Sequence, residues 1–160
     1  MSNEEKAYIA GFLDGDGCIM AQLVRRNDYN FGYQIRVSIV FYQKQSHQEI
    51  LSWLKSKLNY GYIRQRNDGM AEYTIVGLRE VKEILQLLVK HLRLKKALSH
   101  EVIELIKTYP KRMNVEHLIR LSTLVDKTAR FNYSKKRTNT SETIKTFLKG
   151  KNLFPVETSV

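Results

Sequence analysis

Apolar side chains occupy every odd position from residue 31 to residue 41, and this alternation constrains the fold more than any other feature of the sequence. Gln34, Arg36 and Ser38 lie at even positions of the same run. Because successive side chains of a strand point to opposite faces, the run predicts a strand with one buried and one exposed side. Other elements must therefore cover the apolar face, while the polar face stays open.

Four strand-like runs are expected in all, joined in pairs by turns rich in Asn, Asp and Gly: residues 18–25 with 31–43, and 61–66 with 70–76. Helical spacing of apolar residues predicts helices over residues 2–13 and 46–58, further helices from about residue 81, and a last helix beginning at Ser141. This order predicts an α+β fold, with an αββαββα core, a four-stranded antiparallel sheet and C-terminal helices. In a chain of 160 residues we expect a single domain over residues 1–150 and a C-terminal tail over 151–160.

The predicted open face of the sheet mixes Arg with Gln, Glu and Thr. Its members are Gln22, Arg26, Gln34, Arg36, Arg64, Arg66, Glu72 and Thr74. Such a mixture offers both donors and acceptors to base edges in a DNA major groove, although an ordinary solvated face is the simpler alternative. The net charge of +11 favours a polyanionic partner, and we therefore interpret the face as DNA-binding.

Composition also excludes several classes of protein. A single cysteine, Cys18, rules out an intrachain disulfide and fits a reducing compartment. The acidic start has no signal-peptide pattern, and no apolar run approaches the length of a membrane span, so we expect a soluble protein.

Residues 9–17, with the sequence IAGFLDGDG, combine a helical apolar run with two aspartates bracketed by glycines. Ser2 and Glu5 have the spacing of a capping box, which predicts the start of this helix, and we expect it to end near Leu13. Negative charge is unfavourable at the C-terminal end of a helix, so Asp14 and Asp16 point to a function. Binding of a divalent metal ion is the chemistry that fits two such carboxylates.

This stretch resembles the signature of the LAGLIDADG homing endonucleases, with Ile9 in place of the first Leu and Gly15 in place of the second Ala. GYIRQR at 61–66, LRLKK at 92–96 and NTSETI at 139–144 are similar to the single-motif, homodimeric group encoded in group I introns of algal organelle genes. The resemblance implies a site-specific endonuclease that cuts both strands of a long pseudo-palindromic DNA target and leaves 3′ overhangs. It also implies an algal chloroplast or mitochondrion as the location.

The resemblance further implies residue roles. Asp16 matches the catalytic, metal-binding carboxylate, with the Gly15 carbonyl as a second ligand for Mg²⁺, or for Mn²⁺ as a substitute. Gln43 and Lys95 match further catalytic positions, although Gln43 shares the parity of the apolar face. His47 departs from the Arg of relatives. Phosphate contacts are implied for Lys135, Lys136 and Asn139, and a dimer interface for Ala7, Ala10, Gly11 and Asp14.

The expected partners are double-stranded DNA and a second copy of the chain, with neither a membrane nor a nucleotide cofactor. Two alternatives remain open. An intron maturase could keep the fold and the basic face without a metal site, and a DNA-binding protein of this fold could recognise a sequence without cutting it. The intact Asp16 favours the nuclease.

Overall fold

The computed structural model describes residues 1–132 and 137–154. Lys135 and Lys136 lie outside the described residues. Contacts divide the chain into two compact units, the first formed by residues 1–20 and 37–106 and the second by residues 21–36 and 107–160. We treat each unit by itself, and the expectation of one domain over residues 1–150 stays a prediction.

A four-stranded sheet forms with the order β1-β2-β4-β3. Its strands are β1 (Gly17–Arg25), β2 (Tyr33–Lys44), β3 (Tyr62–Gln65) and β4 (Met70–Val76), and both β2 with β4 and β3 with β4 pair antiparallel. The α+β class and the four-stranded antiparallel sheet are thus confirmed. β1 and β2 contribute residues to both units, whereas β3 and β4 belong to the first.

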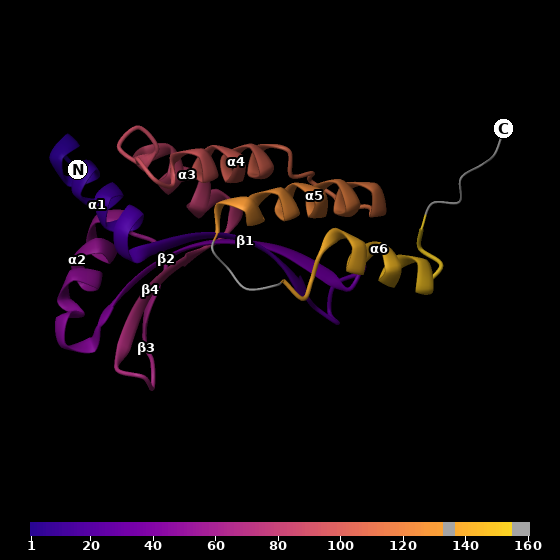
Figure 1. The fold of residues 1–160 in the computed structure, drawn as a ribbon, viewed down its shortest axis with the longest axis horizontal. Coiled ribbons are helices and arrows are strands. Elements are labelled where there is room, and N and C mark those ends of the chain that lie inside the picture. The colour runs from indigo at the N-terminus through magenta and orange to yellow at the C-terminus, as the bar shows by residue number, and fades with distance from the viewer. Residues whose placement is uncertain (133–136, 155–160) are drawn as a thin grey trace. The chain divides into compact units, whose positions relative to one another are not determined.

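The first unit packs helices against the odd-numbered side of its strands. These helices are α1 (Asn3–Asp16), α2 (Glu49–Leu58), α3 (Leu78–Leu88) and α4 (Lys96–Lys107), the last extending one residue beyond the unit. Phe41 of β2 and Tyr73 of β4 are fully buried and stack with ring centroids 5.7 Å apart. Figure 1 shows α3 and α4 on one side of the strands, with the β3–β4 hairpin extending away from them. The alternation in β2 therefore marks the core face correctly.

The start of α1 agrees with the sequence prediction, but its end does not. Ser2 Oγ accepts from the Glu5 backbone N–H at 3.2 Å and the Glu5 carboxylate accepts from the Ser2 N–H at 3.0 Å, which completes the capping box. The helix then continues past Leu13 to Asp16, and β1 begins at the next residue, Gly17. A Cβ at Gly17 would lie within 3 Å of Leu13 side-chain and backbone atoms, so this direct junction requires glycine.

The second unit joins the outer part of the β1–β2 hairpin to α5 (Val115–Thr128) and α6 (Ser141–Gly150). The Arg25 guanidinium lies 3.9 Å from the Phe147 ring centroid and donates to the Gly32 carbonyl at 2.9 Å. Gly32 has a φ of +72°, so the turn occupies residues 26–32 and β2 starts at Tyr33 rather than Phe31. The Asp126 carboxylate accepts from the Ser141 N–H at 2.9 Å and so links α5 to the start of α6.

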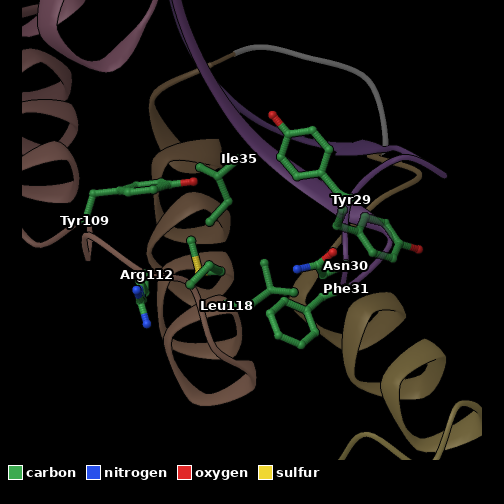
Figure 2. Close-up of a pocket in the computed structure, with 9 residues that line it drawn as sticks. Tyr29, Asn30, Phe31, Ile35, Tyr109, Arg112 and Leu118 are labelled. Atoms are coloured by element: carbon green, nitrogen blue, oxygen red, sulfur yellow. The ribbon is translucent and has the colours of Figure 1, made fainter.

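A pocket of about 320 Å³ lies within the second unit. Four aromatic residues and five others line it: Tyr29, Asn30, Phe31, Tyr33, Ile35, Tyr109, Arg112, Met113 and Leu118. Figure 2 shows Tyr109 pointing toward Ile35. Burial raises the pKa of Tyr109, and the Tyr29 phenol raises it further. None of the residues predicted to be catalytic lines this pocket.

Among residues 1–132 and 137–154, no helix is both long enough and apolar enough to cross a membrane.

Candidate active site

Asp14 and Asp16 both lie in the last turn of α1, but their surroundings differ. Asp16 is exposed, whereas Asp14 is half-buried and its carboxylate accepts three backbone hydrogen bonds. The donors precede α4 directly: the N–H groups of Arg93 at 2.7 Å, Leu94 at 3.2 Å and Lys95 at 2.9 Å. The first N–H groups of a helix have no partner within the helix, and an anion is stabilised there. Asp14, on a different helix, therefore holds the three residues that lead into α4.

Lys95 returns a bond to the same residue. Its ammonium group donates to the Asp14 main-chain carbonyl at 2.5 Å, one of the carbonyls that the end of α1 leaves without a helical partner. Burial raises the pKa of the Cys18 thiol, and the Lys95 ammonium opposes this shift, which indicates that Lys95 lies near the start of β1. The structure thus brings Lys95 to the end of the helix that carries Asp16.

The extension of α1 beyond Leu13 now has a physical reason. Both ends of the Asp14 residue, its carboxylate and its carbonyl, are held by the segment before α4. Gly15 accordingly stays within the helix instead of ending it. This link joins residues 79 to 81 positions apart in the sequence, so local signals could not predict it.

Gln43 lies near the end of β2, in a regular register opposite Ala71 of β4. The strand neither bulges nor stops at Phe41, so Gln43 keeps the parity of the core face, and it is half-buried beyond that core. Its side-chain carbonyl accepts from the Lys44 N–H at 2.9 Å. Within the described residues its hydrogen bond is therefore local, while His47 is exposed in the short 3-10 helix η1 (Gln45–His47).

On the open side of the first unit, the structure corrects the prediction for Glu72 and Thr74. Both are buried, at 9% and 4% exposure, because β4 is an interior strand and its residues lie between the side chains of β2 and β3. Glu72 stands opposite Arg64 in the β3–β4 register, and its carboxylate lies 2.7 Å from an Arg64 guanidinium nitrogen. Arg66 lies 3.9 Å from the other oxygen of Glu72 and 2.7 Å from Asp68. Glu72 therefore holds exposed arginines instead of facing solvent itself.

The second unit contributes its own polar positions. Gln22 and Arg26 are exposed, and Gln34 and Arg36 are half-buried. Arg26 forms an exposed ion pair with Asp28 at 2.8 Å, and this pair lowers the pKa of Asp28 to about 2. The Asn139 side chain donates to the Leu23 carbonyl at 2.9 Å, so it supports β1.

The small residues of α1 do not all face the same way. Ala7, Gly11 and Gly15 are exposed, and a Cβ added at either glycine would meet no atom within 4 Å. Ala10 is fully buried with Ile9 and Leu13, so it belongs to the core of its own unit and not to an outward face. The open stripe has a spacing of four residues, which keeps its members on one side of the helix.

The donor set at the end of α1 suits a hard divalent cation. Asp16 offers an exposed carboxylate and Gly15 a main-chain carbonyl, both oxygen ligands. Across residues 1–132 and 137–154, no three or more His, Cys, Asp or Glu side chains form a group that could hold a metal ion. Mg²⁺ tolerates so sparse a protein site because it retains waters and takes phosphate oxygens.

Comparison with known proteins agrees with this geometry and defines the class as a DNA-cleaving enzyme family. The sequence matches the LAGLIDADG endonuclease family over residues 9–107. DNA endonuclease I-CvuI of Chlorella vulgaris is 38% identical over 143 residues, covering 89% of each chain. DNA endonuclease I-CreI of Chlamydomonas reinhardtii is 31% identical over 142 residues, covering 88% of this chain and 86% of the relative. The chain therefore belongs to the LAGLIDADG endonuclease family.

Solved structures share the fold over almost the whole chain. A crystal structure of I-CvuI with the I-CreI target, in the presence of Mg, superposes with a TM-score of 0.91 and 36% identity, and it covers 95% of this chain and 97% of that one. The archaeal intron-encoded endonuclease I-Vdi141I, complexed with DNA, shares the fold with a TM-score of 0.82 at 16% identity.

A structural role for Asp14 was an expectation of the sequence, but two sets of contacts were not predicted: the hydrogen bonds that Asp14 accepts from residues 93–95, and the ion pair of Glu72 with Arg64. One signal was available for the first. The residues before α4, HLRLK, offer no Ser, Thr, Asp or Asn at the start of the helix, so its N-terminus needs a cap from elsewhere. No comparable signal identifies which of the acidic residues supplies it.

Proposed function

We propose that this protein is a homodimeric, Mg²⁺-dependent homing endonuclease that hydrolyses both strands of a long pseudo-palindromic DNA site and leaves 3′ overhangs. The observation that carries the proposal is the exposed carboxylate of Asp16 beside the Gly15 carbonyl, with the Lys95 ammonium held at the same helix end. The bound cation would activate water and stabilise charge on the scissile phosphate. I-CvuI, a relative with 36% identity, has been crystallised with its target DNA.

The chain's own residues have separable tasks in this proposal. Asp16 and Gly15 hold the cation, and Lys95 offsets the negative charge that develops on the phosphate. Gln43, half-buried near the end of β2, orients water at the rim of the site. Arg64 and Arg66, together with Gln22, Arg26, Gln34 and Arg36, contact the DNA. Lys135 and Lys136 stay proposals for phosphate contacts.

The outward stripe of Ala7, Gly11 and Gly15 supports a dimer formed through α1, because small residues let two helices approach closely. A two-fold dimer would supply one Asp16 to each DNA strand. Gly11→Arg is expected to give a monomer in light-scattering measurements and to abolish double-strand cutting. Gly150→Arg, at another glycine with open space around it, is the matched control and should stay dimeric.

The direct test presents supercoiled plasmids carrying a library of pseudo-palindromic sites, with Mg²⁺, Mn²⁺ or EDTA. Linear product from a small set of sites in Mg²⁺ or Mn²⁺, with none in EDTA, is the expected result, and the sequenced ends should carry 3′ overhangs. Tight, site-specific binding without linear product would instead identify a non-cleaving DNA-binding protein. Tight binding to a group I intron RNA without cutting would identify a maturase. By the same proposal the protein acts in an algal chloroplast or mitochondrion, where its host intron would lie.

A further inference from the structure

Residues 93–95, between the buried side chain of Leu92 and the start of α4, are held through their main chain. Leu94 is 80% exposed and Arg93 is also exposed, so neither anchors the segment in the core. The carboxylate of Asp14 instead receives all three N–H groups of residues 93–95, at 2.7, 3.2 and 2.9 Å. Hydrogen bonds to a charged acceptor are stronger than those between neutral groups, so Asp14 contributes strongly to the placement of residues 93–95.

The bond from Lys95 to the Asp14 carbonyl fixes the direction of the ammonium group. An ammonium has three donor hydrogens, and one of them is used by the Asp14 carbonyl at 2.5 Å. Two donors remain for a phosphate oxygen and a water. The main chain of Lys95 is fixed as well, because its carbonyl accepts from the Ser99 N–H and from the Ser99 hydroxyl, each at 2.9 Å.

Asp14 and Asp16 are two residues apart in one helical turn, so successive rotations of about 100° place their side chains on nearly opposite sides of α1. One carboxylate therefore points to the segment before α4 while the other stays exposed. We propose that Asp14 is a positioning residue, which sets the place of the Lys95 ammonium relative to Asp16 and thereby acts on the rate of strand cleavage. The inference rests on the proposed nuclease function.

The test measures single-turnover cleavage at saturating DNA, well below the unfolding temperature. Asp14→Asn keeps one oxygen acceptor but turns an NH₂ group toward the remaining N–H donors. Since displacement of a catalytic group by about 1 Å can cost up to about 100-fold in rate, we expect a fall of roughly 30-fold. DNA affinity, measured with Ca²⁺ in place of Mg²⁺, should change by less than about threefold, because Asp14 contacts no base or phosphate in this scheme.

A matched control separates positioning from general stability. Asp126 accepts from the Ser141 N–H at 2.9 Å and so holds the first residue of α6, whose N-cap is Thr140, much as Asp14 holds the residues before α4. Asp126→Asn should lower the unfolding temperature by an amount similar to Asp14→Asn but leave the cleavage rate unchanged. Equal loss of cleavage in both variants would overturn the positioning role.

A double-mutant cycle tests whether Asp14 acts through Lys95. In a Lys95→Met background, Asp14→Asn should cause little further loss, whereas two effects that multiply would overturn the proposal. Asp14→Glu, which keeps the charge but moves it by one methylene, serves if Asp14→Asn does not fold, and it should also reduce the rate.

Amide hydrogen exchange provides a readout that does not depend on cleavage. The N–H groups of Arg93 and Lys95 should exchange faster in Asp14→Asn, and unchanged exchange would overturn the proposal even if no target is cut. If the wild-type protein cuts no DNA while exchange does accelerate, the nuclease function fails and the capping geometry stands, but the effect on cleavage is refuted. If the wild type and Asp14→Asn cut DNA at the same rate, the positioning role of Asp14 is refuted while the nuclease function stands.

Discussion

Two regions of the first unit use a carboxylate to hold basic side chains, and they do so in opposite ways. At the end of α1, Asp14 binds backbone N–H groups before α4, and Lys95 binds the Asp14 backbone in return. On the open side of the sheet, Glu72 binds the guanidinium of Arg64 directly. A main-chain link fixes a position, whereas a side-chain pair can exchange its partner for a ligand. Under the proposed function, this difference would suit catalysis in the first region and DNA recognition in the second.

The largest expected effect removes chemistry and leaves recognition intact. Asp16→Asn takes away the exposed carboxylate of α1, so we expect cleavage to fall by about a thousandfold or more while DNA binding persists. Plasmid linearisation, paired with a gel-shift assay in Ca²⁺, measures both. Glu116→Gln, at an exposed carboxylate in the first turn of α5, is the control for loss of charge. If cleavage persists in Asp16→Asn, Asp16 takes no part in the reaction, and the proposed difference in function between the two regions is wrong.

The next effect, at Arg64 on the sheet, is the reverse: DNA binding weakens while the cleavage rate is retained. Arg64→Ala removes an exposed guanidinium, and loss of a base contact typically costs about 1 to 3 kcal/mol, or up to about 100-fold in affinity. The cleavage rate at saturating DNA should stay near the wild-type value. Competition between the preferred site and single-base variants measures the change. A large fall in the saturated rate, with affinity unaltered, would show that the sheet also takes part in the chemistry.

A smaller effect is expected at Glu72, which pairs with Arg64 but is not itself proposed to contact DNA. Glu72→Gln keeps the shape but removes the charge that pairs with Arg64 and Arg66, so we expect a loss of specificity of a few-fold to about tenfold. General affinity should rise or stay level, because one negative charge leaves a surface that faces phosphates. Site-preference profiling by sequencing measures the relaxation. Unaltered preference would mean that Glu72 acts only in folding.

The smallest effect concerns the exposed ion pair of Arg26 and Asp28. It serves as a reference for the contacts of Asp14 and Glu72. Arg26 lowers the pKa of Asp28 from 3.8 to about 2. Because the pKa is lowered in the folded state, the pair stabilises the fold above the ordinary carboxyl pKa, and this contribution disappears as pH falls toward 2. NMR titration of the Asp28 carboxyl carbon should give that pKa, which high salt should move back toward 3.8. If the pKa of Asp28 did not change with salt, the Arg26–Asp28 pair would be fixed in place like the pair of Glu72 and Arg64.

Local patterns of sequence predicted the start of α1, the core face of β2 and the helix that begins at Ser141, since caps and side-chain alternation are set by neighbouring residues. They failed at the end of α1, where the deciding bonds come from residues 93–95. They also failed at Glu72 and Thr74, because burial there depends on which strand is interior, and at Ala10, whose side of the helix is set by packing. The two carboxylates at a helix end indicated a metal site from the sequence alone, but the choice of Asp16 over Asp14 and the roles proposed for Gln43 and Lys95 came from resemblance.

The direct junction between Asp16 and Gly17, together with the link across 79 to 81 residues, has a consequence for how the enzyme matures. Contacts between distant parts of a chain form late, because loop closure must precede them. A nascent or truncated chain that stops before residue 93 carries Asp14 and Asp16 but lacks Lys95 and the three N–H groups that the Asp14 carboxylate binds. We expect such fragments not to cleave DNA. Active nuclease would then form only after synthesis has passed the start of α4.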